Sequence, residues 1–325
     1  MTLKKLAEMT GTSVGTVSKA FSGSPEISLE TREKIYDVAK ANGCFDKYYK
    51  APRPRPLVAL LFPESESEYY GREMGLLERA LNDRGADTII AITRFEHERE
   101  ERLFRELAYR MKVDGVILCG SAELISNPDE IPLVTISSKK HEKANADNVF
   151  IDFKSGIDAV VSTIKDYGHR EVGFIGERLT VAKENLFKQA MRRAGLPIYE
   201  RYIVCSDKRF ADAGRECMAE LISRGELPSV IVAAYDQIAF GAMRYATERG
   251  YKIPDDVSFF GIDDISVTPF ADVPLSSLHV DLEDACERII DLIFKRIDNK
   301  YYREPEDILV SATPRVRASL RRIEK

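Results

Sequence analysis

Apolar residues recur at intervals of three and four in three short stretches near the N-terminus, which predicts three amphipathic helices over residues 3–9, 13–21 and 28–43. A hydroxyl side chain stands at the start of each stretch and can cap it by accepting a backbone hydrogen bond. Two short helices joined by a Gly-containing turn and supported by a third are typical of a helix-turn-helix. The expected caps are Thr2, Ser13 and Ser28.

The second of these helices has two unlike faces. Helical spacing points Val17, Ala20 and Phe21 inward. The opposite face is small and polar and carries one cation, which suits a major groove: hydroxyls can bond phosphates and a lysine can bond guanine. From spacing alone, a solvated helix face fits equally well. The outward residues are Gly15, Thr16, Ser18, Lys19 and Ser22.

From Leu57 onward, short apolar runs alternate with longer amphipathic stretches. This alternation predicts an α/β fold with parallel sheets covered on both faces, and the length favours two such lobes, with ligands bound at the carboxyl ends of the strands. The expected strands are 57–62, 88–92, 116–118, 133–136, 172–175, 230–232 and 257–260. The expected helices are 69–84, 98–112, 158–167, 183–194, 211–224 and 237–249.

A segment rich in proline and arginine, residues 46–56, separates the two regions. Alternating prolines fix φ and exclude helix, so the stretch from Pro52 is expected to be an extended spacer. One interpretation is a plain interdomain linker. The other is that Arg53 and Arg55 enter a narrow A·T-rich minor groove. The expected organisation is a helix-turn-helix domain (1–45), this linker, and a two-lobe domain for effector binding and dimerisation (57–325).

Charge is distributed unevenly along the 325 residues. The net charge is −5, but residues 1–56 carry ten Lys or Arg against six Asp or Glu, so this segment is +4 and the remainder is −9. A basic head joined to an acidic body is compatible with DNA binding by the head. No run of eighteen apolar residues occurs, and the N-terminus is amphipathic, so the protein is expected to remain in the cytoplasm.

Few signs of catalytic or metal chemistry are present. The sequence lacks a dinucleotide-binding glycine motif, a phosphate loop and a nucleophile elbow. Its five cysteines form no C-x-x-C pair and are expected to be reduced and buried, and its four histidines are scattered, so neither a metal nor a cofactor is expected. Adjacent acids such as Asp255-Asp256 and Asp263-Asp264 are more often caps and turns than catalytic pairs. We therefore expect that the protein is not an enzyme.

The N-terminal segment closely resembles the DNA-binding head of the lactose-repressor (LacI/GalR) family of transcriptional regulators. The matching stretches are 3–7, 11–19 and 28–35, with the sequences LKKLA, GTSVGTVSK and SLETREKI. The resemblance implies that the start of the second helix reads bases and that neighbouring residues contact the backbone. The family's leucine-bearing hinge helix is replaced here by the proline-rich segment. The residues implied to contact DNA are Thr2, Lys5, Ser13, Val14, Gly15, Thr16, Ser18, Lys19 and Ser22, with Arg53 and Arg55 added by the minor-groove hypothesis.

The body resembles the effector-binding core of the same family, which is similar to periplasmic sugar-binding proteins. The resemblance is most specific over 250–264, and 236–242 and 274–278 support it. It implies two lobes that close on an effector and three strands that cross between them, near 153–158, 279–283 and 308–318. The residues implied to bind the effector are Tyr69, Tyr70, Lys183, Arg209, Tyr235 and Asp263.

Three of these positions depart from the family pattern. Lys183 replaces a clamping arginine, Tyr235 replaces the usual asparagine before Asp236, and Arg209 falls where many members place an aromatic residue. Two cations facing one pocket favour an anionic ligand such as a sugar acid. The alternative is that both cations are surface ions.

These features together predict a dimeric DNA-binding repressor controlled by a carbohydrate-like effector. One rival is a sugar-binding sensor without sequence-specific DNA binding, and another is an enzyme built on the two-lobe fold. The basic head argues against both.

Overall fold

The computed structural model describes residues 1–22, 24, 26–48, 55–120, 125–127, 131–137, 145–299 and 304–323. The chain divides into two compact units, Met1–Pro56 and Leu57–Lys325, which we call the head and the body. None of the helices in the described part of the chain has the length and hydropathy needed to cross a membrane.

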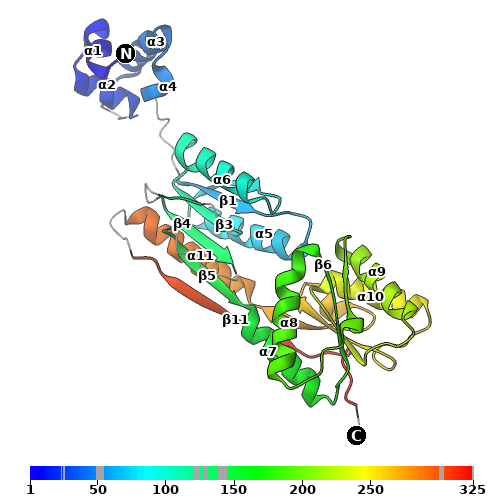
Figure 1. Cartoon of the computed structure of the whole chain (residues 1–325). Helices are drawn as coiled ribbons and strands as arrows, with labels where there is room; N and C mark the ends of the chain where they lie inside the picture. Colours follow the sequence, from blue (N-terminus) through cyan, green and yellow to red (C-terminus); the bar gives the residue numbers. More distant parts are fainter. Residues whose placement is uncertain are drawn as a thin grey trace. The chain divides into compact units, whose positions relative to one another are not determined.

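The head contains the three predicted helices, α1 (Leu3–Thr10), α2 (Val14–Phe21) and α3 (Leu29–Ala41) (Figure 1). The predicted caps are confirmed, because each side-chain oxygen accepts a hydrogen bond from the backbone three residues later. A small core holds the helices together, made by Leu6, Ala7, Val17, Ala20, Phe21, Ile35, Ala39 and Cys44.

A short fourth helix, α4 (Phe45–Tyr48), stands where the sequence predicts the start of the linker. Phe45 and Tyr48 pack against the head core, and the Tyr48 hydroxyl donates a hydrogen bond to the Met1 carbonyl at 2.7 Å. The packed part of the head therefore extends at least to Tyr48, because these aromatic rings have apolar partners in the head core. Arg53 and the prolines beside it lie outside the described residues.

The body contains two sheets that share one long strand. The first has the order β2-β1-β3-β4-β5-β11 and the second β11-β10-β9-β8-β6-β7. Every pair is parallel except β10–β11. The strands are β1 (Leu57–Phe62), β2 (Asp87–Ile92), β3 (Gly115–Cys119), β4 (Leu133–Ser137), β5 (Asp147–Asp152), β6 (Val172–Glu177), β7 (Ile203–Ser206), β8 (Val230–Ala233), β9 (Ser258–Asp263), β10 (Ser276–Val280) and β11 (Asp307–Arg315).

Helices pack against both sheets, so the predicted α/β architecture with two lobes is confirmed (Figure 1). The first lobe has α5 (Glu68–Asp83), α6 (His97–Arg105), a π-helical turn (Glu106–Arg110) and α11 (Leu282–Asp298). The second has α7 (Phe153–Asp166), α8 (Val181–Arg193), α9 (Phe210–Ser223), α10 (Asp236–Glu248) and the 3₁₀ turns Arg178–Thr180, Glu200–Tyr202 and Thr268–Phe270.

Three segments of the chain pass between the lobes. One joins β5 to α7, another joins β10 to α11, and β11 pairs with β5 through its first half and with β10 through its second. The expected crossing strand at 153–158 is wrong, because these residues open α7. The Asp152 carboxylate caps that helix by accepting a hydrogen bond from the Ser155 amide at 3.0 Å, so the strand ends at Asp152.

All five cysteines are free. Four are buried as expected, but the expectation is wrong for Cys205, which is exposed at the end of edge strand β7. An edge strand presents alternate side chains to solvent, and the Cys205 thiol donates a hydrogen bond to the Glu184 carboxylate at 3.1 Å.

Candidate functional site

In the head, the second helix presents a polar surface made of small residues. The Ser13 hydroxyl accepts a hydrogen bond from the Thr16 amide at 3.0 Å, which fixes the start of α2. Val17 and Ala20 are fully buried, and the side of the helix away from them is open to solvent. Val14, at its first position, is 45% exposed although it is apolar. Of the implied DNA-contacting residues in the head proper, Thr2, Lys5, Ser13, Val14, Gly15, Ser18, Lys19 and Ser22 are exposed and Thr16 is half-buried.

The cation of this surface is not fixed by a buried partner. Lys19 forms an ion pair with Glu26, and both side chains are more than half exposed. Such an exposed pair is worth little in water, so a phosphate or a base edge can replace Glu26 as the partner of Lys19. Arg55 is half-buried among the described residues, and Arg53 lies outside them.

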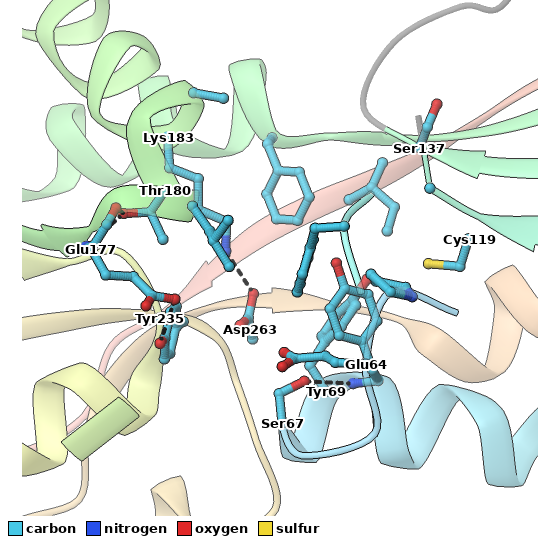
Figure 2. Close-up of a pocket in the computed structure, with 18 of the residues that line it drawn as sticks. Glu64, Ser67, Tyr69, Cys119, Ser137, Glu177, Thr180, Lys183, Tyr235 and Asp263 are labelled. Atoms are coloured by element: carbon cyan, nitrogen blue, oxygen red, sulfur yellow. Dashed lines mark hydrogen bonds and ion pairs between the residues drawn. The ribbon is translucent and has the colours of Figure 1, made fainter. Parts of the chain in front are cut away.

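In the body, a cavity of about 610 Å³ lies at the carboxyl ends of the parallel strands, where ligands bind in such folds. Its lining comes from residues that end or follow β1, β2, β3, β6, β8 and β9. Figure 2 shows Glu64 and Tyr69 of the first lobe across the cavity from Lys183, Glu177 and Tyr235 of the second. All six residues implied to bind the effector line it: Tyr69, Tyr70, Lys183, Arg209, Tyr235 and Asp263.

Lys183 and Asp263 form an ion pair inside the cavity. The Lys183 ammonium donates to the Asp263 carboxylate at 3.1 Å and to the Ala234 carbonyl at 3.0 Å, and it lies 5.0 Å from the centre of the Phe153 ring. Asp263 is the last residue of β9 and has φ +99°, a conformation that turns the chain sharply at the end of the strand. The side chains are only 21% and 12% exposed, so Lys183 is not the surface ion of the alternative interpretation.

Arg209 lies between two carboxylates. Its two terminal nitrogens donate to the Glu64 carboxylate, one of them at 3.0 Å, and its Nε donates to the Glu177 carboxylate at 3.1 Å. The Tyr235 hydroxyl donates to the same Glu177 carboxylate at 2.9 Å. Burial alone would lower the pKa of the Arg209 guanidinium, but the hydrogen bonds and charges of the two glutamates outweigh it and raise that pKa. Arg209 is therefore a permanent cation held within the cavity, and the surface-ion interpretation is wrong for it too.

Glu64 and Glu177 are charged cavity residues that the sequence did not identify. Their side chains are only 9% and 3% exposed. Glu64 follows β1 by two residues and Glu177 is the last residue of β6. An acidic residue at the carboxyl end of a buried parallel strand is a signal that could have found both.

The pairing of the cations argues against the anionic ligand inferred from the sequence. Arg209 is shared by two carboxylates, and Lys183 is bound to a third. An anion entering the cavity would have to displace one of these partners and would face the remaining carboxylates at short range. The lining favours a neutral ligand rich in hydroxyl groups.

Aromatic rings supply much of the remaining lining. Tyr69 and Tyr70 lie on α5, with ring centres 5.4 Å apart in an edge-to-face arrangement. Burial, with help from nearby carboxylates, raises the pKa of both phenols, so each keeps its proton and can donate a hydrogen bond. Flat apolar faces next to hydroxyl donors suit the mixed surface of a sugar ring. The aromatic residues lining the cavity are Tyr69, Tyr70, Phe95, Phe153, Phe210 and Tyr235.

Asp264, next to the cavity residue Asp263, has a structural role. Its carboxylate accepts hydrogen bonds from the Thr268 hydroxyl and from Arg315, and it pairs with Arg317 at 2.7 Å. Burial opposes ionisation of Asp264, but these donors lower its pKa overall. The adjacent acids thus differ in role, since one faces the cavity and the other joins the loop after β9 to the end of β11.

Behind Tyr69 and Tyr70, Glu73 is fully buried and its Oε1 atom has no hydrogen-bond partner. Burial raises the pKa of this carboxyl to about 7, although the Cys119 thiol that donates to it opposes the shift. In the unfolded chain the carboxyl ionises near its usual pKa of 4.5, so between pH 4.5 and 7 the folded state binds more protons. The free energy of unfolding should therefore fall as the pH rises through this range.

We expect Glu73→Gln to remove this loss, because the amide stays neutral at every pH. The free energy of unfolding of the variant minus that of the unsubstituted protein should increase by about 2 kcal/mol from pH 5 to pH 8. Urea unfolding at the two pH values measures this difference. Glu78→Gln, an exposed position on the same helix, is the control and should give a pH-independent difference. A pH-independent difference for Glu73→Gln as well would contradict the burial argument.

Comparison with known proteins agrees with this organisation. A family model for a periplasmic binding protein-like domain matches residues 161–320. The chain is 28% identical to the HTH-type transcriptional regulator DegA of Bacillus subtilis, with 85% of this chain and 86% of DegA covered. It is 26% identical to the HTH-type transcriptional repressor PurR of Pasteurella multocida, with 92% of each covered.

Two solved structures give the same picture. The complex of the transcriptional regulator CelR with cellobiose is 26% identical and has a TM-score of 0.68, with 98% of this chain and 99% of that chain covered. The repressor AscG of Escherichia coli is 22% identical and has a TM-score of 0.71, with 82% of this chain and 99% of that chain covered, a likeness that shows the fold. The relatives are thus named as helix-turn-helix transcriptional regulators or repressors, and one of the solved structures is a complex with cellobiose.

Proposed function

Because the chain belongs to the LacI/GalR family of transcriptional regulators, we propose that it is a repressor whose operator affinity depends on a small sugar-like effector bound in the cavity between the two lobes. The head reads the DNA and the body senses the effector. Such a protein acts where the chromosome lies, so we place its activity in the cytoplasm.

The observation that carries this proposal is the pairing of two surfaces in one chain. The head presents a capped helix whose outward side is small, polar and exposed. The body presents a cavity at the carboxyl ends of parallel strands, with aromatic faces and a paired carboxylate. The first surface suits a major groove and the second suits a polyhydroxylated ring.

A neutral mono- or disaccharide is the effector class that the lining supports best. Asp263 offers a carboxylate that can take two hydroxyl donors, and Tyr69 and Tyr70 offer neutral hydroxyls. The volume of about 610 Å³ is within the usual range for small-molecule sites. The relative CelR has been solved with cellobiose, which makes that disaccharide a sensible probe.

We further propose that the protein is a homodimer, because a helix-turn-helix of this kind reads two half-sites about one turn of DNA apart. The 3₁₀ turn Thr268–Phe270 supplies a candidate contact. Phe270 is 86% exposed, the highest fraction among the exposed large apolar side chains that the structure describes, and Val267 near it is 47% exposed.

Replacing Phe270 with Asp should raise the dimer dissociation constant about tenfold, because the substitution puts a charge into an apolar contact. Sedimentation equilibrium measures this directly. Val316→Asp, at an exposed apolar residue after β11, is the control and should leave the constant unchanged. An unchanged dimer dissociation constant in the Phe270→Asp variant would show that this turn is not part of the dimer interface.

Selection of genomic DNA fragments by the purified full-length protein tests the proposed function. We expect a palindromic site whose affinity falls steeply with salt and changes when the effector is added. Enrichment of no sequence over random DNA would contradict the assignment of the head as a specific reader.

A further inference from the structure

We propose that Arg209 is a positioning residue which, with Glu64 and Glu177, forms a clasp that holds the two lobes together across the cavity before any effector binds. The inference deepens the proposed function, and it rests on that function only in taking the cavity as the effector site. Arg209 and Glu177 come from the second lobe, and Glu64 comes from the first.

The geometry of the clasp is that of a two-pronged ion pair. Both terminal nitrogens of the guanidinium reach the Glu64 carboxylate, one to each oxygen, while Nε is directed at Glu177. A planar fork matched to a carboxylate in this way is stronger and more directional than a single contact. The contact therefore fixes the distance and the angle between the lobes, whereas a flexible lysine would not.

The surroundings of the clasp strengthen it. Glu64 and Glu177 are nearly fully buried, and the guanidinium lies 4.4 Å from the centre of the Phe210 ring and 5.6 Å from that of Phe95. Phe95 belongs to the first lobe and Phe210 to the second. Arg209, itself 31% exposed, thus contacts both lobes through its charge and through its flat faces, and its two carboxylate partners are shielded from water.

A second polar contact crosses the cleft nearby. The Ser266 amide of the second lobe donates to the Glu68 carboxylate of the first at 2.7 Å. This single contact is exposed, so it adds less than the partly buried, two-pronged contact of Arg209 with Glu64. Removing the clasp should therefore leave too little attraction to keep the lobes closed in the absence of a ligand.

The charges also explain why the clasp is sensitive to substitution. One guanidinium serves two carboxylates, so loss of Arg209 leaves two buried anions facing each other. Opening the lobes is the simplest relief, because it returns Glu64 to water. For the effector, a cavity that is already closed lowers the cost of binding, so the clasp sets the concentration at which the effector acts.

Inter-lobe distances in the ligand-free, full-length protein test the proposal. Spin labels are attached through a non-natural amino acid at two exposed positions, Glu98 on α6 and Asp212 on α9, so that the five cysteines stay untouched. The labelled chain is mixed with excess unlabelled chain to leave one labelled copy per assembly. Double electron–electron resonance then gives the distribution of distances between the two labels.

We expect one short distance in the unsubstituted protein and about a tenfold or greater rise in the ratio of long to short distances in Glu64→Gln and in Arg209→Gln. Adding Glu64→Gln to Arg209→Gln should not open the lobes further, because the contact is already lost and the second substitution removes one of the two facing anions. Arg215→Gln is the control, since Arg215 lies on the same helix, α9, but pairs with Glu248 within the second lobe.

An unchanged distribution in both Glu64→Gln and Arg209→Gln, with folding verified by circular dichroism, overturns the clasp. An equal shift in Arg215→Gln also overturns it, since the effect would then belong to the helix and not to the contact. The measurement uses neither DNA nor effector, so it tests the clasp independently of the proposed function. Rejection of the clasp would not contradict the regulator function, and failure of the head to bind specific DNA would not contradict the clasp.

Discussion

Asp263→Asn should weaken effector binding about a hundredfold. The substitution keeps the shape of the side chain, and Asn tolerates the positive φ of this position, so the backbone is retained. It removes the charged acceptor for sugar hydroxyls. It also removes the Asp263 carboxylate as a partner of the Lys183 ammonium, which keeps its hydrogen bond to the Ala234 carbonyl. Loss of a charged, buried hydrogen-bond partner typically costs about 2–5 kcal/mol.

The measurement is isothermal titration calorimetry with the sugar that stabilises the protein most in a panel of neutral mono- and disaccharides that includes cellobiose. Asp255→Asn, at an exposed acid on the loop before β9, serves as the control and should bind normally. Normal affinity in the Asp263 variant would mean that the ligand binds elsewhere in the cavity.

The combined substitution Thr16→Ala and Lys19→Ala should lower operator affinity about a hundredfold. Thr16 lies in the first turn of α2 and Lys19 in the last, on the side away from the head core. A base or phosphate contact of this kind is worth about 1–3 kcal/mol, and two such contacts together give the stated loss. Fluorescence anisotropy at fixed salt measures the affinity.

Lys34→Ala is the matched control, since Lys34 is an exposed cation on α3 outside the proposed contact set. It should reduce binding only slightly, through the general charge of the head. The exposed Lys19–Glu26 pair adds little to stability, so the double variant should fold normally. Equal losses in the control and the double variant would show that only net charge matters.

The sequence predicts the head well because its signals are local. Caps such as Thr2 and Ser13, the turn at Gly11, and spacing in threes and fours lie within a few residues of the helices they define. The end of the head was harder to place, because α4 depends on contacts with helices far along the chain. The Tyr48 hydroxyl reaches Met1, a partner that no local pattern reveals.

In the body, local apolar runs predicted most strands, but some elements were missed. The alternating burial of β11 gives no continuous apolar run, and only the family resemblance indicated a strand there. Helix α11 does carry a clear apolar stripe through Ile289 and Ile293, and Asp281 caps it, so attention to that spacing would have found it.

The candidate site shows the same difference between what sequence patterns indicate and what depends on contacts between distant residues. Residues identified by the resemblance, such as Asp263 and Tyr235, do line the cavity. Their charge balance could not be predicted, because it depends on which carboxylates, distant in the sequence, the fold places next to Lys183 and Arg209. Arg209 read alone suggests an anionic ligand, whereas Arg209 seen between Glu64 and Glu177 is already satisfied.

Operator affinity measured with and without effector tests the central claim most directly. DNA selected from the genome by the full-length protein is titrated with the protein, in the presence and absence of the panel sugar that stabilises the protein most, and then with the Asp263→Asn variant. We predict a specific site whose affinity changes at least about fivefold with the sugar, and a variant that binds the same site but does not respond to the sugar. A site bound equally with and without the sugar, or no specific site at all, would contradict the link between the cavity and the head.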